Sequence, residues 1–200
     1  MNDAEERARF ADELREETRT LLIESGLLGL LQEKFGEATV TGSAGYDLMA
    51  WRGIDLHLPC EADRAIEWLG LAAEIATTLD ERGLKLHRAQ FANDYLDPQH
   101  LGAGLRWTLE FADFADNHWS CDIWGFEPFD YAVRQARDAN LRADLASADR
   151  DLILRLKHEA RERFGYYGVM VSAMDIYQFA LDGAGETLDE LERWRGLVAE

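Results

Sequence analysis

Residues 41–58, TGSAGYDLMAWRGIDLHL, constrain the fold of this chain more than any other segment. They begin with Gly42 and Ser43 at the end of a short strand, pass through a turn or short helix, and enter a second strand at residues 53–58. That strand alternates, so Ile54, Leu56 and Leu58 point to one face and Gly53, Asp55 and His57 point to the other. The segment therefore predicts two strands of one sheet joined by a tight turn.

The polar residues of this segment fit the chemistry of a phosphate site. A Gly-Ser turn lets backbone N–H groups approach a phosphate closely. Asp55, on the neighbouring strand, could hold a divalent cation against that phosphate. The alternative is structural: Asp55 would be a buried carboxylate satisfied by neighbouring polar groups, because burial without partners is costly.

The rest of the chain alternates between helical and strand patterns. Residues 4–34 have helical periodicity, with Gly26 and Gly29 as candidate breaks and Gly36 as a stop signal. The expected strands are residues 38–41, 53–58, 84–91, 104–112 and 119–124, and the other expected helices are residues 61–82, 128–145, 148–164, 172–182 and 186–198.

This order predicts an α/β (α+β) fold, with a small mixed sheet, flanking helices on one face and a C-terminal helical bundle. We expect a core at residues 1–126 and a helical region at residues 127–200. Because no flexible linker separates them and the apolar pattern continues, the helical region should pack on the core.

Composition excludes several classes of protein. The net charge of −18 disfavours a nucleic-acid partner, since phosphate backbones are repelled. No apolar run approaches the roughly 18–20 residues that span a bilayer, and the N-terminus lacks a signal pattern, so a cytoplasmic location without membrane contact is expected.

Cys60 and Cys121 lie in apolar runs without zinc-ligand spacing, which predicts two buried thiols. Dinucleotide, Walker and serine-hydrolase motifs are absent from the sequence.

The spacing from Gly42-Ser43 to Asp55 resembles that of nucleotidyltransferases of the polymerase-beta type. That superfamily has a Gly-Gly or Gly-Ser pair, about ten residues, an Asp-x-Asp or Asp-x-Glu pair, and a third carboxylate on a later strand. Asp55 matches the second acid of the pair, and Asp122 is the candidate for the third. The stretches YDLMAWRGIDLHL and SAMDIYQFALDGAGETLDEL resemble a group of uncharacterised bacterial members, which extends the likeness over nearly the whole chain.

One position departs from the superfamily pattern, because Gly53 stands where the first metal-binding acid is expected. Candidate replacements are His57 on the same strand face, Asp47 in the preceding turn, and Glu110, which should share a face with Asp122. Each of them has an alternative reading as a solvated side chain. A second aspartate at position 53 is expected to add a ligand with little steric cost.

The resemblance implies a protein that uses Mg²⁺ or Mn²⁺, held by Asp55 and Asp122 with Glu110 or His57. Gly42, Ser43 and Lys157 would bind a nucleoside triphosphate, unless Lys157 lies on a solvated helix face. The implied reaction moves a nucleoside monophosphate to a hydroxyl of a small molecule or protein, with Asp55 and Asp122 as the catalytic acids. The alternative is a catalytically impaired nucleotide-binding or regulatory protein of the same fold, which Gly53 favours.

Overall fold

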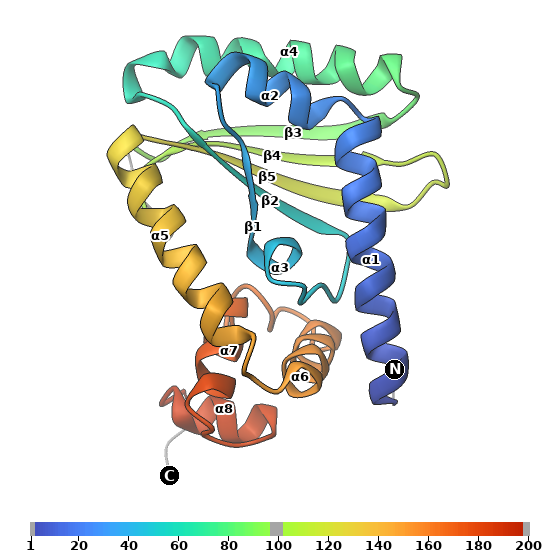
Figure 1. Ribbon diagram of the computed structural model, residues 1–200, viewed down its shortest axis with the longest axis vertical. Coiled ribbons are helices and arrows are strands. Elements are labelled where there is room, and N and C mark those ends of the chain that lie inside the picture. Colours follow the sequence, from blue (N-terminus) through green and yellow to red (C-terminus); the bar gives the residue numbers. More distant parts are fainter. Residues whose placement is uncertain (1–2, 97–101, 198–200) are drawn as a thin grey trace.

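The computed structural model describes residues 3–96 and 102–197, and its centre is a five-stranded mixed sheet (Figure 1). The strand order is β1-β2-β5-β4-β3; β2 and β5 run parallel, and the other neighbours are antiparallel. The strands are β1 (Thr39–Thr41), β2 (Gly53–Pro59), β3 (Lys85–Asn93), β4 (Leu105–Ala112) and β5 (His118–Phe126). The helices are α1 (Ala4–Glu24), α2 (Leu27–Phe35), α3 (Gly42–Gly45), α4 (Ala65–Glu81), α5 (Pro128–Leu145), α6 (Arg150–Glu162), α7 (Ala173–Leu181) and α8 (Leu188–Trp194), with a 3-10 turn η1 (Ala62–Arg64) before α4.

The predicted fold class is confirmed, and most of its elements lie within two residues of the expected bounds. Gly26, in the left-handed conformation, separates α1 from α2, and Gly36, which also has a positive φ, ends α2. Gly29 is not a break, because it lies inside α2. The last helix is shorter than predicted and ends at Trp194, and residue 198 of the predicted helix lies outside the described residues. The segment between β3 and β4 is described except for residues 97–101.

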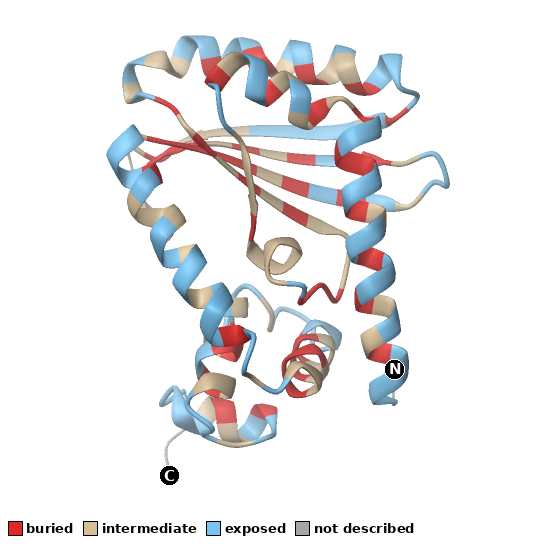
Figure 2. Cartoon of the chain, viewed as in Figure 1, coloured by how far each residue is buried: buried red, intermediate tan, exposed pale blue. Residues whose placement is uncertain are grey.

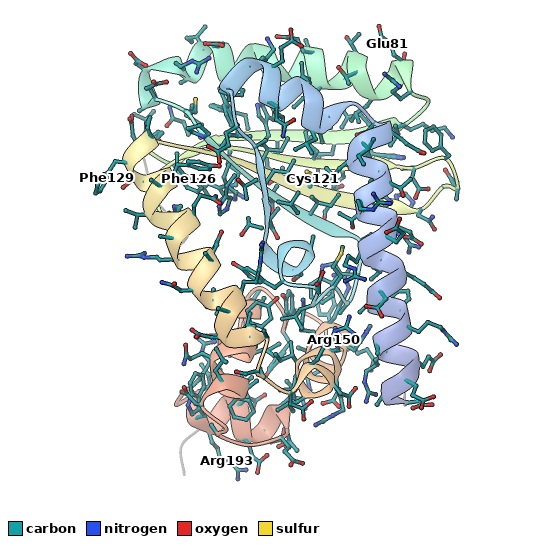
Figure 3. The ribbon with its side chains drawn as sticks, viewed as in Figure 1. Glu81, Cys121, Phe126, Phe129, Arg150 and Arg193 are labelled. Carbon is teal, nitrogen blue, oxygen red and sulfur yellow. The ribbon has the colours of Figure 1, made fainter. Side chains whose placement is uncertain are left out.

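One face of the sheet is apolar and is covered by α1, α2 and α4 (Figures 1 and 2). Leu56 and Leu58 of β2 are fully buried there, as the alternation predicted. Cys60 and Cys121 are buried free thiols, and Cys121 lies in the middle of the sheet (Figure 3). This close packing holds β2 and β5 in place, and it therefore also positions the side chains on their opposite face.

The C-terminal helices form a second apolar cluster, built around Leu156, Ile176 and Phe179. Capping boxes fix the starts of α7 and α8. The second cluster is tied to the first region by α6 and α1, where Arg7 donates to both oxygens of Asp151 at 2.7 and 2.8 Å. The division of the chain at residue 126 stays a prediction. None of the described helices combines the length and apolar character needed to cross a membrane.

Candidate functional site

Two carboxylates lie side by side on the face of the sheet opposite the apolar one. Asp55 of β2 stands directly across from Asp122 of β5 in the parallel register. Neighbouring strands lie about 4.8 Å apart, and residues in register point to the same face. Asp55 and Asp122 therefore lie next to each other on one face of the sheet.

The Gly42-Ser43 turn lies immediately beside Asp55. Thr41 of β1 pairs with Asp55, and α3 begins at the next residue. Gly42 has a φ of 59°, and a Cβ atom there would overlap the Asp55 carboxylate. Glycine is therefore required at this position, both for its backbone conformation and for the close approach of the acid.

Lys157 reaches the same place from α6. Its side chain is fully buried, and its Nζ donates to Ser43 Oγ at 2.6 Å and to the Leu48 carbonyl at 2.5 Å. Tyr177 of α7 completes the group, with its hydroxyl 3.1 Å from Ser43 Oγ. The reading of Lys157 as a solvated lysine is wrong, because α6 packs with this face inward. The adjacent His158 points elsewhere, against Phe10.

Burial shifts the pKa values of Asp55 and Lys157. Burial, followed by repulsion from Asp122, raises the pKa of Asp55 to about 7, although Lys157 acts in the opposite direction. Burial lowers the pKa of Lys157 to about 7, with Asp55 opposing that change. Both groups therefore lack the solvation that would stabilise their charges, which is typical of a site that binds a charged ligand.

Trp51 fills the space beside Gly53. A Cβ atom at Gly53 would lie 3.1 Å from the Trp51 indole Nε1 and 3.4 Å from Ser120 Oγ. The indole is itself held by the edge of Tyr167, with ring centroids 4.6 Å apart, and by Lys157, whose Nζ lies 4.9 Å from the ring centroid. A side chain at position 53 therefore requires the indole to shift by a few tenths of an ångström, a steric cost that the sequence analysis did not anticipate.

Two of the other proposed ligands lie outside this group. Glu110 shares the sheet face of Asp122, as predicted, but it stands opposite Ser120 and forms an exposed ion pair with Arg88 at 3.2 Å. The position next to Asp122 belongs to Thr108, whose hydroxyl donates to Asp122 Oδ1 at 2.5 Å. Asp47 pairs with Arg15 at 3.3 Å and does not replace the missing acid.

His57 faces a carboxylate that the sequence analysis missed. Its Nδ1 lies 3.8 Å from Oδ2 of Asp138 on α5, and it has no hydrogen-bond partner within the described residues. Burial lowers the pKa of His57 to about 4. Asp138 itself accepts from Thr41 Oγ1 at 2.5 Å and from the Tyr46 hydroxyl at 2.8 Å. No sequence signal marked Asp138, since a helical aspartate usually faces solvent.

These residues give a donor set suited to one hard cation rather than two. Within residues 3–96 and 102–197, no group of three His, Cys, Asp or Glu side chains is placed to hold one metal ion. The proposed set of Asp55, Asp122, Glu110 and His57 therefore does not come together as one cluster. Mg²⁺ often takes only one or two protein carboxylates when substrate phosphates supply the remaining ligands, so Asp55 and Asp122 fit one such ion.

Comparison with known proteins gives a likeness of fold only. No protein-family model and no curated protein matches the chain. Two solved structures of Cid1 do match. One, titled for its RNA terminal uridylyl transferase activity, is 18% identical with a TM-score of 0.47, and the match covers 86% of this chain and 51% of that one. The other, titled as a poly(U) polymerase, is 14% identical with a TM-score of 0.45 and coverages of 88% and 53%.

The chain spans about half the length of the solved chains that it matches. TM-scores below 0.5 say nothing about what this chain binds or catalyses.

Proposed function

We propose that this protein binds a nucleoside triphosphate together with one divalent cation, and that it does not transfer nucleotides at an enzymatic rate. Gly42, Ser43 and Lys157 would hold phosphate oxygens, and Asp55 and Asp122 would hold a Mg²⁺ or Mn²⁺ ion. The bound ion would supply positive charge between the two carboxylates and the phosphates. Of the two functions that the superfamily resemblance implies, this is the non-catalytic one.

The observation that carries this proposal is the Trp51 indole packed beside Gly53. Two-metal transfer chemistry needs anionic ligands for both ions. The first acid is replaced by glycine, the space beside it holds an indole, and Glu110 pairs with Arg88 instead. A second ion, the one that activates the attacking hydroxyl, would lack ligands.

Binding is supported by the polar groups around the turn. Ser43 Oγ and Lys157 Nζ already lie 2.6 Å apart, so a single phosphate oxygen could contact both. The three donors of the lysine ammonium point to Ser43 Oγ, the Leu48 carbonyl and the Tyr177 hydroxyl, so a phosphate oxygen would take the place of one of the two hydroxyl groups. Phosphate would also restore to Lys157 the electrostatic stabilisation that burial removes.

A second candidate function is slow transfer with Asp55 as general base. The observation in its favour is the pKa of Asp55, raised to about 7 by burial and by Asp122. A base is most effective when its pKa is close to the working pH. In this reading Asp55 would accept the proton of an acceptor hydroxyl, and Asp122 alone would be left to hold the cation.

Calorimetric titration with each nucleoside triphosphate and Mg²⁺ tests binding, and release of pyrophosphate from the same mixtures tests transfer. We expect saturable binding for the wild type and a loss of at least tenfold in affinity for Lys157→Met, with no pyrophosphate above background. Arg9→Gln is the control, since Arg9 is an exposed cation near the start of α1. Pyrophosphate release that is abolished by Asp55→Asn would support the second candidate. Absence of any nucleotide affinity would rule out both.

A further inference from the structure

Two exposed histidines meet on the sheet face that carries Asp55 and Asp122, at the end where the turn between β4 and β5 projects (Figure 1). His87 lies near the start of β3, and His118 is the first residue of β5. Their ring centroids are 5.3 Å apart, and the rings are tilted by 53° to each other. His118 and Asp122 lie at opposite ends of a five-residue stretch of β5, so the pair is roughly 13 Å from the acids.

A β-bulge in β3 brings the two side chains together. The register between β3 and β4 shifts between Leu86 and Arg88, which leaves His87 as an extra residue without a partner on β4. Such bulges change the direction in which a side chain points. On β4, Ala112 stands directly across from His118 and is fully buried. Because its side chain is only a methyl group, the two imidazoles can meet above it although β4 separates β3 from β5.

Neither imidazole is committed to another polar group. Within residues 3–96 and 102–197, no hydrogen bond or ion pair holds the imidazole of His87 or of His118. Lys85, which also stands across from Ala112, forms an exposed ion pair with Asp116 at 3.8 Å, so its positive charge is balanced nearby. Because both histidines are exposed, each ring can turn a nitrogen toward a shared ligand.

The separation of the two rings fits a metal ion held between them. Zn²⁺ binds imidazole nitrogens at about 2.0–2.1 Å in tetrahedral geometry, which places the centroids of two imidazoles on one ion roughly 5 Å apart. The observed separation of 5.3 Å is close to that value. In the part of the chain that the structure describes, no third His, Cys, Asp or Glu completes the group, so water would occupy the remaining positions on the ion.

We infer that His87 and His118 bind one Zn²⁺ ion at the surface, apart from the site of Asp55 and Asp122. Imidazole nitrogen favours Zn²⁺ and other late transition metals, whereas carboxylates favour Mg²⁺ and Mn²⁺, so the two sites differ in their ligand chemistry. The bound ion joins the bulge of the edge strand β3 to β5 across β4. It stabilises the folded chain by mass action, because unfolding separates the two imidazoles. This inference does not depend on the proposed nucleotide binding.

Zn²⁺ is the probe, titrated calorimetrically into the full chain. We expect a site for one Zn²⁺ ion per chain, with at least tenfold weaker binding for His87→Ala and for His118→Ala, because either change removes the second, intramolecular contact. The variant that lacks both imidazoles should bind little more weakly than either single variant, since each single variant has already lost the paired ligands. His158→Ala is the matched control: it removes an imidazole that packs against Phe10, outside the pair, and should bind Zn²⁺ as the wild type does.

Two further arms locate the bound ion. Asp55→Asn with Asp122→Asn should keep the Zn²⁺ binding that depends on the histidines, since the acids lie roughly 13 Å away. In the wild type, Zn²⁺ should shift the imidazole NMR signals of His87 and His118 together, which tests the site without a substitution. Equal Zn²⁺ affinities for the wild type, His87→Ala and His118→Ala would overturn the inference. It would also be overturned by loss of all Zn²⁺ binding in the double acid variant, or by NMR shifts confined to His57, since either result would place the ion beside the acids.

Discussion

The two faces of strand β2 show how one short segment serves two purposes. On one face Leu56 and Leu58 are fully buried beneath α1, α2 and α4. On the other, Asp55 and His57 lie among polar side chains, and their pKa values are shifted by burial without full hydrogen bonding. The first face stabilises the fold, whereas the second keeps polar groups at an energetic cost.

The polar face therefore costs stability, which fits the proposed binding role better than a structural role. Buried carboxylates are costly unless they are paired. Asp55 accepts no hydrogen bond from another residue within the described segments, and its near neighbour Asp122 repels it. A cation between the two carboxylates would remove both penalties.

The largest effect should come from the apolar face. Leu56→Ala leaves a cavity in a fully buried position and should lower the free energy of unfolding by about 2–5 kcal/mol. Urea unfolding measures this loss. At temperatures where the variant is still folded, its Mn²⁺ affinity should equal that of the wild type. A large change in Mn²⁺ affinity would show that the two faces are not independent.

The second prediction concerns Asp55 and pH. Because the folded protein holds the Asp55 proton more tightly than the unfolded chain does, Asp55 should reduce stability as pH rises from about 4 to about 7. The difference from the ordinary value of 3.8 corresponds to at most about 4 kcal/mol. Asp55→Asn should therefore be more stable than the wild type at pH 7.5 in EDTA, and the difference should shrink at pH 4.5.

Lys157 affects stability in a different pH range, so its effect can be told apart from that of Asp55. Its lowered pKa means that stability should rise with pH between about 7 and 10.5. Urea unfolding of the wild type and of Asp55→Asn, each at pH 7.5 and at pH 4.5 in EDTA, measures the stability difference predicted for Asp55. Parallel pH profiles for the two proteins would show that Asp55 is not buried as an unpaired acid.

The third prediction addresses the missing acid. Gly53→Asp alone should not tighten Mn²⁺ binding, because the Trp51 indole occupies the adjacent space. The double variant Gly53→Asp with Trp51→Ala should tighten it by about tenfold, or about 1.4 kcal/mol, relative to Trp51→Ala. Calorimetric titration of Mn²⁺ at one pH and salt concentration decides the matter. A tenfold gain in Mn²⁺ affinity for Gly53→Asp alone would show that Trp51 does not keep a carboxylate at position 53 away from the metal.

The smallest effect is expected at Glu110, on the same sheet face but outside the site. Glu110→Gln removes an exposed ion pair with Arg88 and should change stability by less than about 1 kcal/mol. Its Mn²⁺ affinity should stay within twofold of the wild type. A tenfold loss in calorimetry would instead make Glu110 a ligand that moves to the metal on binding.

The sequence was sufficient for the features that depend on local pattern. Alternation along residues 53–58 identified the polar and apolar faces of β2, and the Gly-Ser turn was located correctly beside Asp55. Lys157 and Asp138 were harder, because each lies on a helix far along the chain and reaches the site only through tertiary packing. The position of the Trp51 indole likewise depends on Tyr167 and Lys157, which no local pattern connects to it.

The central claim, that the site takes one cation and not two, is tested most directly by counting bound metal. Mn²⁺ binding can be followed by electron paramagnetic resonance in the presence of a saturating, non-hydrolysable nucleoside triphosphate. Counting the Mn²⁺ that stays with the chain after free nucleotide and free metal have been removed gives the number of ions held per chain. We predict one ion per chain, lost in the variant Asp55→Asn with Asp122→Asn. Two ions per chain, both dependent on these acids, would contradict the account and restore the two-metal enzyme.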